Sequence, residues 1–168
     1  MDDEKKVWIR ESPNGDPKTF ENLVRAHQRM IHALTFRMTG SKADAEDLAQ
    51  ETFIHAFRKL NLFRGDSAFS SWLYRIAMNL CLNWQKREQY RGRLSEKWEF
   101  PDAGSAVLDE QVTRQVQVAL MKLHPKQRAA IVLTIYEEKS HAEAAQVLGC
   151  SETTVSWRVF AAKKKLKR

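Results

Sequence analysis

The sequence predicts an all-α protein made of two small helical domains joined by a flexible linker. Apolar residues recur at helical spacing along most of the chain, and β-hairpin signals are absent. Glycine and proline, 6 and 4 of 168 residues, cluster at boundaries. Residues 91–110 contain several of them and no sustained apolar period. An ordered loop of this length is the alternative, but such loops are uncommon inside compact domains. We therefore expect domains at 1–91 and 109–168 and a linker at 92–108.

Charge and composition favour a polyanionic partner and argue against membrane, metal-binding and enzyme functions. Lys and Arg number 28 against 21 Asp and Glu, and this excess of +7 suits a polyanionic partner. No apolar run of membrane-spanning length and no signal-peptide pattern occur, so we expect a cytoplasmic protein. Cys81, Cys150 and the five histidines lack zinc-site spacing, and we interpret all seven as structural or surface residues. Because no nucleophile arrangement or phosphate loop is present, we expect no enzyme activity, no cofactor and no metal.

The first two predicted helices follow from capping signals. Asp16-Pro17 starts one as cap and first-turn proline, and Gly40 ends it. Its apolar face holds Phe20, Leu23, Val24, Ile31, Leu34 and Met38. Ser41 caps the next, whose core face holds Ala45, Leu48, Ala49, Thr52, Phe53, Ala56, Phe57 and Leu60. The opposite face carries Asp47, Gln50, Glu51, Ile54 and Arg58. Such a face is usually only solvated, but the apolar Ile54 within it suggests a partner helix as the alternative.

A third helix follows the turn at Phe63, Gly65 and Asp66, and we expect Asp66 or Ser67 to cap it. Its core stripe holds Phe69, Trp72, Leu73, Ile76, Ala77, Leu80 and Trp84. Another face carries Arg75, Asn79, Asn83, Lys86 and Arg87. Asparagine amides can pair with base edges and the cations can hold phosphates, although a plain polar surface is the commoner outcome.

The C-terminal residues have the pattern of a helix-turn-helix. Ser140 and Glu143 have capping-box spacing, Gly149 suits a left-handed helix end, and Ser151 caps a second helix. In that second helix, Val155, Val159, Ala162 and Leu166 form the predicted buried stripe. Trp157, Phe160 and Lys164 point the opposite way, flanked by Thr153 and Ser156. Outward polar, aromatic and basic groups suit a helix that enters a DNA major groove. Coverage of the aromatics by a third element or an oligomer contact is the alternative.

Taken together, three segments resemble a known family. They are "DAEDLAQETFIHAFRKL", "FRGDSAFSSWLYRIAMNLCLNWQKR" and "LHPKQRAAIVLTIYEEKSHAEAAQVLGCSETTVSWRVFAAKKKL", in this order. The chain resembles the extracytoplasmic-function (ECF) group of bacterial sigma-70 factors from about Asp16 to Leu166. The resemblance implies that the chain consists of regions 2 and 4. Its partners would then be promoter DNA and core RNA polymerase, through the β′ clamp helices and the β subunit of the polymerase. It further implies a cytoplasmic protein with an anti-sigma factor as an additional partner, which could hold it at the inner membrane face.

The resemblance also implies roles for individual residues. The polymerase-binding residues would be Asp47, Gln50, Glu51 and Ile54. The −10 element would be bound by Phe63, Arg64, Asp66, Ser67, Arg75, Asn79, Asn83, Lys86 and Arg87. The −35 element would be bound by Thr153, Thr154, Ser156, Trp157, Arg158, Phe160, Lys163 and Lys164.

One departure from the family pattern concerns the reading helix. Many members carry arginines at its middle and end, whereas Ser156, Trp157 and Ala161 occupy three of those places here and Arg158 alone is retained. Because arginine to guanine is the commonest specific contact, the −35 sequence of relatives does not transfer to this chain. A stand-alone helix-turn-helix regulator and a helical interaction module, such as a sigma decoy, are the alternative functions.

Overall fold

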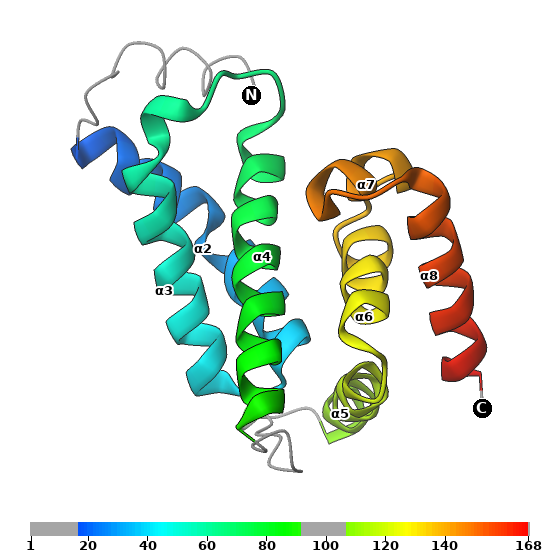
Figure 1. Cartoon of the computed structure of the whole chain (residues 1–168). Coiled ribbons are helices and arrows are strands. Elements are labelled where there is room, and N and C mark those ends of the chain that lie inside the picture. The colour runs from blue at the N-terminus through cyan, green and yellow to red at the C-terminus, as the bar shows by residue number, and fades with distance from the viewer. Residues whose placement is uncertain (1–16, 92–106, 168) are drawn as a thin grey trace.

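The computed structural model describes residues 17–91 and 107–167, and every regular element in these ranges is helical, which confirms the all-α class. The N-terminal domain consists of α2 (Pro17–Thr39), α3 (Lys42–Arg58), the short 3-10 turn η1 (Leu60–Leu62) and α4 (Phe69–Tyr90). The C-terminal domain consists of α5 (Val107–Met121), α6 (Pro125–Ile131), its π-helical continuation η2 (Val132–Tyr136), α7 (His141–Leu148) and α8 (Glu152–Leu166). Figure 1 shows the two domains side by side, with α6 and α7 next to α4.

The boundary between α2 and α3 follows the predicted local signals. Gly40 has φ +70°, a left-handed conformation that glycine adopts without strain, and α2 ends just before it. The Ser41 hydroxyl accepts the backbone N–H of Asp44 at 3.2 Å and so caps α3. Pro17 is the first residue of α2, as predicted, while the expected cap Asp16 lies outside the described residues.

Most of the predicted apolar faces are buried, and two of their residues are corrections. Phe57 is 45% exposed, because α3 ends one residue later and the ring packs only edge-on against Phe20. Leu166 is 40% exposed at the last residue of α8. The predicted cap of α4 is also wrong: Ala68 occupies the N-cap position and no side chain caps the helix there. The predicted core residues of α2–α4 that are fully enclosed are Leu23, Ile31, Leu34, Met38, Ala45, Leu48, Ala49, Thr52, Ala56, Leu73 and Ala77.

Helix α4 has a second buried stripe, which the sequence pattern did not predict. Tyr74, Met78, Cys81 and Gln85 lie at helical spacing along one face, and all are buried. This face meets α6 and α7 of the C-terminal domain, and the buried residues of both domains form one continuous cluster. Burial raises the pKa of the Cys81 thiol to about 12, so this thiol stays protonated at neutral pH.

A small polar cluster joins the domains at this face. The Tyr74 hydroxyl donates to Glu137 Oε2 at 2.5 Å, and Arg37 Nη1 lies 3.3 Å from Glu137 Oε1. The Arg37 guanidinium also lies 4.4 Å from the centre of the Tyr136 ring. Burial, and then the hydrogen bond to Glu137, raise the pKa of Tyr74 far above its ordinary value. We call Arg37, Tyr74, Tyr136 and Glu137 the interdomain cluster.

Arg128 is the second connection between the domains. It is 4% exposed, and in the described ranges it has no carboxylate partner within ion-pair distance. Its guanidinium instead donates to backbone carbonyls at two helix ends. Nη1 reaches Met38 O of α2 at 2.5 Å, and the other nitrogens reach Leu120 O, Met121 O and Leu123 O at 2.9–3.1 Å. Helix C-terminal ends carry partial negative charge, so the buried cation is stabilised without an acid.

We therefore predict that Arg128→Met lowers the free energy of unfolding by about 3 kcal/mol or more, because it leaves several buried carbonyls without a donor. Urea denaturation of the full chain measures this. Arg25→Met is the matched control: Arg25 is exposed and pairs only with Glu21, so its loss should cost less than about 1 kcal/mol. Equal effects of the two substitutions would contradict the role given to Arg128.

Candidate functional site

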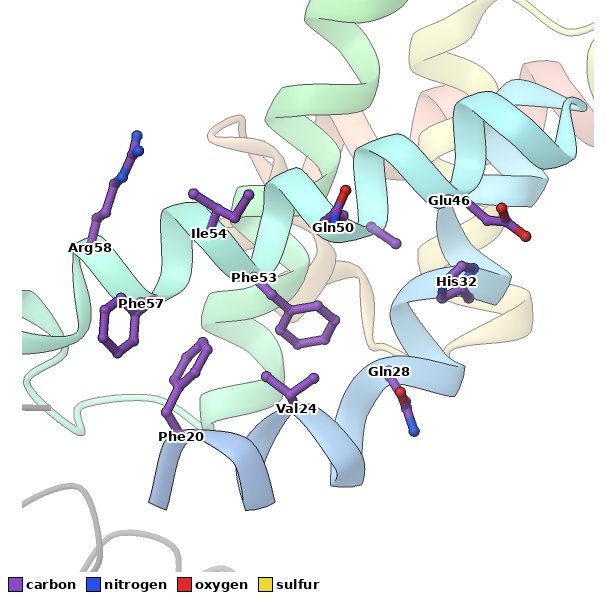
Figure 2. A pocket seen from close by; sticks show the side chains of 11 residues that line it. Phe20, Val24, Gln28, His32, Glu46, Gln50, Phe53, Ile54, Phe57 and Arg58 are labelled. Carbon is purple, nitrogen blue, oxygen red and sulfur yellow. The ribbon is translucent and has the colours of Figure 1, made fainter. Parts of the chain in front are cut away.

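An apolar groove lies between α2 and α3. Figure 2 shows Phe20 opposite Phe57 at one end and Phe53 directed toward Val24 beside them. The groove measures about 560 Å³, and its rim carries Gln28, His32, Glu46, Gln50, Ile54 and Arg58. Ile54 and Phe57 are each 45% exposed. An apolar floor with a polar and charged rim fits the side of an amphipathic helix from another molecule.

The predicted partner-binding residues of α3 lie at and beside this groove. Gln50 and Ile54 line it, and Asp47 is exposed on the same helix. Glu51 is half-buried, and its carboxylate lies 3.7 Å from His55 Nε2. The structure thus confirms the solvent-accessible acidic and amide surface predicted from periodicity, and it adds the apolar groove that the sequence pattern did not predict.

The polar stripe of α4 is exposed along its whole length, as predicted. Arg75, Asn79, Asn83, Lys86 and Arg87 are all exposed. Arg75 differs from the others, because its Nη2 donates to Gln146 O of α7 at 2.7 Å. One end of the stripe therefore contacts the helix-turn-helix, while the two asparagines remain accessible to a ligand.

The loop before α4 rests on an aromatic cluster. The Phe63 ring lies 5.4 Å from Phe69 and 5.3 Å from Trp72, and Phe63 and Trp72 are both half-buried. Arg64, Asp66 and Ser67 of the loop are exposed, and Gly65 turns the chain with φ +76°. Partly exposed aromatic rings beside a basic stripe can stack unpaired bases, so Trp72 joins the candidate residues here.

The helix-turn-helix forms as the capping signals predicted. Ser140 and Glu143 make both hydrogen bonds of a capping box at the start of α7. Gly149 has φ +62°, and the Ser151 hydroxyl accepts the Thr154 N–H at 3.1 Å at the start of α8. Small, buried Ala144 and Ala145 lie where α7 packs against its neighbours.

The outward face of α8 is open to solvent. Trp157 and Phe160 are 66% and 67% exposed, so in the described part of the chain no third element covers them. Thr153, Lys163 and Lys164 are exposed too, whereas Val155, Val159 and Ala162 are buried. Large exposed aromatics beside lysines are unusual on a surface that has no partner, and they indicate a binding face.

Three other predicted residues of α8 already have partners within the protein. The Thr154 hydroxyl lies 2.7 Å from Ser151 Oγ, and Arg158 Nη1 lies 3.6 Å from Cys150 Sγ. The Ser156 hydroxyl lies 2.8 Å from His141 Nδ1 of α7. No sequence pattern predicts this last contact, because it depends on how closely the two helices cross.

With these surfaces defined, family models provide a direct comparison. A model described as Sigma-70 region 2 matches residues 23–91, which contain the groove and the polar stripe. A second, described as Sigma-70, region 4, matches residues 113–166, which contain the helix-turn-helix. The chain belongs to the sigma-70 family. It is an ECF-type member, as its similarity to curated proteins also shows.

Three of these relatives show how far the similarity extends. ECF RNA polymerase sigma factor SigM of Mycobacterium tuberculosis is 36% identical, over 92% of this chain and 78% of its own length. RNA polymerase sigma-H factor of Pseudomonas aeruginosa is 34% identical, over 89% and 84%. ECF RNA polymerase sigma-E factor of Escherichia coli is 33% identical, over 94% and 90%.

Solved structures show the same fold. CnrH, solved with the cytosolic domain of CnrY, superposes with a TM-score of 0.73 at 29% identity and covers 97% of this chain and 94% of its own. The sigma factor RpoE of Bartonella quintana, solved with the anti-sigma factor NepR, gives a TM-score of 0.71 at 26% identity, with 89% and 95% covered.

No helix in residues 17–91 and 107–167 combines the length and apolar character that a bilayer crossing requires. Across the same ranges, no group of three His, Cys, Asp or Glu side chains is arranged to hold a metal ion.

Proposed function

We propose that this sigma factor binds core RNA polymerase and directs it to promoters by capturing a −10 strand and reading a −35 duplex. The observation that carries the proposal is the exposure of three chemically distinct surfaces on three different helices. The face on α3 carries acidic and amide groups around the exposed Ile54. The stripe on α4 carries asparagines and arginines, and the face on α8 carries aromatic and basic side chains. A stand-alone regulator would need only the last of these.

The α3 face and the adjoining groove are proposed to bind the β′ clamp helices of polymerase. A clamp helix could place apolar side chains between Phe57 and Ile54 while its polar side meets Asp47, Gln50 and Glu51. The same surface is a natural target for an anti-sigma factor, which would block polymerase by occupying it. Similarity to CnrH and RpoE, each solved with a partner protein, supports a partner of this kind.

The α4 stripe and the aromatic cluster at its N-terminal end are proposed to hold a melted −10 strand. Flipping a base out of the duplex costs a few kcal/mol, and capture of the exposed base offsets that cost. Trp72 and Phe63 offer ring surfaces for stacking, and Asn79 and Asn83 offer amides for base edges. The neighbouring Lys86 and Arg87 are exposed and available to hold phosphates.

The closed arrangement of the two domains limits what the free chain can do. The −10 and −35 elements are separated by about 25 base pairs, or roughly 85 Å of duplex at 3.4 Å per base pair. A compact chain of 168 residues has a radius of gyration of only about 15 Å. We therefore infer that the domains separate when the protein occupies a promoter, and that polymerase binding supplies the free energy for this change.

The proposal is tested by transcription from a randomised promoter library with purified protein, in the presence and absence of core polymerase. We expect transcripts from a defined subset of promoters only when both proteins are present. Specific duplex footprints without polymerase, together with no stimulated transcription, would instead establish a stand-alone regulator. No effect on transcription and no DNA binding would favour an interaction module.

Alanine at Asp47, Gln50 and Glu51 together should weaken binding to core polymerase at least tenfold and leave helicity unchanged, since none of the three is buried. Competition binding against labelled parent protein measures the affinity, and circular dichroism measures the helicity. Glu21→Ala is the control, because it removes an exposed carboxylate from α2 outside the groove lining. Unchanged affinity of the triple variant would remove the clamp assignment.

Asn79→Ala or Asn83→Ala should reduce promoter melting more than initial promoter binding, because the amides contact bases only after the strands separate. Permanganate reactivity of −10 thymines reports melting, and gel mobility of the complex formed at low temperature reports initial binding. Gln89→Ala, at an exposed amide beyond the stripe on the same helix, serves as the control. Equal melting by variant and parent would count against strand capture by α4.

Trp157→Ala should change which −35 sequences are preferred, because aromatic and methyl contacts in the major groove discriminate thymine. Lys164→Ala should instead weaken all sequences about equally and reduce the salt slope by roughly one unit, as expected for one lost phosphate contact. Selection from a −35 library at fixed salt, followed by salt titration, separates the two effects. A Trp157→Ala variant that keeps the parent's preference would show that the indole does not read bases.

A further inference from the structure

His141 and Ser156 connect the two helices of the helix-turn-helix. His141 is the first residue of α7, Ser156 lies one turn into α8, and both side chains are half-buried. The atoms Nδ1 of His141 and Oγ of Ser156 are 2.8 Å apart. Ser156 also occupies one of the places where many family members carry arginine, so this contact lies within the proposed −35 reading surface.

The direction of this hydrogen bond follows from the second partner of Ser156. Its hydroxyl donates to Glu152 O at 3.1 Å, and a serine hydroxyl has only one proton to donate. Both hydrogen bonds can form together only when the Ser156 oxygen accepts the proton carried by His141 Nδ1. In that arrangement Nδ1 carries the proton of the neutral ring, and Nε2, at the opposite edge of the ring, is the position where the charged form carries its second proton. Protonation can then charge the imidazole without breaking the contact to Ser156.

No acidic group in the described ranges is placed to neutralise that charge. Among the described residues, no carboxylate lies within ion-pair distance of His141, and Nε2 has no hydrogen-bond partner. The charged groups on the surrounding elements are otherwise engaged or exposed. Glu143 accepts from the Ser140 N–H, Lys139 Nζ lies 5.6 Å from the centre of the Tyr74 ring, and Arg75 of α4 donates to Gln146 O. Glu138, before α7, and Glu152, at the start of α8, are exposed.

We propose that His141, held in place by Ser156, is a −35 DNA contact whose imidazolium binds a backbone phosphate. The inference rests on the proposed function, because it requires α8 to lie in the major groove. In that docking geometry the first helix of the motif crosses the phosphate backbone, which brings the start of α7 to the DNA. Phosphate binding would then be coupled to uptake of one proton, so −35 affinity falls as pH rises.

The salt dependence of binding distinguishes this contact from general electrostatics. Each phosphate neutralised by a protein cation adds about 0.9 to the slope of log affinity against log salt. Histidine side chains as a class change charge between about pH 5 and 8, so a phosphate contact made by an imidazolium should be present at the lower end of this range and lost at the upper end. The slope should therefore be steeper by about one unit at the lower pH, and the change should depend on His141.

The experiment measures binding of the polymerase holoenzyme to a labelled duplex that carries a −35 sequence recovered from the promoter library, over a salt series at each pH. The parent should show the difference in slope. His141→Gln should show the shallow slope at both pH values, and His141→Lys, with a permanent charge, should show the steep slope at both. Ser156→Ala, which releases the ring, should weaken binding at the lower pH and reduce the difference in slope.

His124→Gln is the matched control, because His124 is an exposed histidine of the same domain. Partial burial and nearby cations, first Lys126 and then Lys165, hold its pKa below the usual value, so we expect the difference in slope to persist. Loss of the difference in His124→Gln, or its absence in the parent, would overturn the assignment of His141. A parent holoenzyme that yields no selected −35 sequence would contradict the proposed function itself, and with it this inference.

Discussion

The buried guanidinium of Arg128 is the constraint on which the arrangement of this molecule depends. It has no carboxylate partner in the described ranges, and its hydrogen bonds go to carbonyls at the end of α2, at the end of α5 and in the turn after α5, which belong to different domains. Removing such a charge from water is costly unless its donors are satisfied. The carbonyl of Met38 therefore has to stay beside the C-terminal domain as long as Arg128 is buried there. The interdomain cluster around Glu137 adds a second polar connection along the same boundary.

This boundary gives α4 two surfaces with different tasks. One holds Tyr74, Met78 and Cys81 against the C-terminal domain, and the other presents Asn79 and Asn83 to solvent. Arg75 belongs to the second surface but donates to Gln146 of α7, so domain closure and the proposed −10 surface share a residue. Opening of the domains would release this guanidinium for a phosphate. Promoter binding and domain separation would thereby favour each other, which explains how a chain with a closed free form can serve two distant DNA elements.

Features that depend on short stretches of sequence were predictable. The capping box at Ser140, the left-handed Gly149 and the outward Trp157 follow from neighbouring residues and helical periodicity. Features that depend on which helix faces meet were not. The buried stripe of α4 includes Tyr74 and Gln85. Because these side chains carry polar atoms, the stripe does not form an apolar pattern in the sequence. Arg128 resembles an ordinary surface arginine in the sequence, and the contact of His141 with Ser156 spans 15 residues. The cap predicted at Asp66 or Ser67 is wrong because α4 begins at Phe69, which makes Ala68 the N-cap residue.

The central claim is that the domains are closed in the free chain and separate on the promoter. Single-molecule energy transfer between dyes at Asn61 and Lys126, both exposed, in different domains and outside the proposed binding residues, measures this directly. Cys150→Ser would remove the accessible native thiol, while Cys81 is buried and can remain. The account predicts high transfer efficiency for the free protein and a clear decrease in the complex with core polymerase and promoter DNA. The same efficiency in both states, in a complex that transcribes, would contradict it.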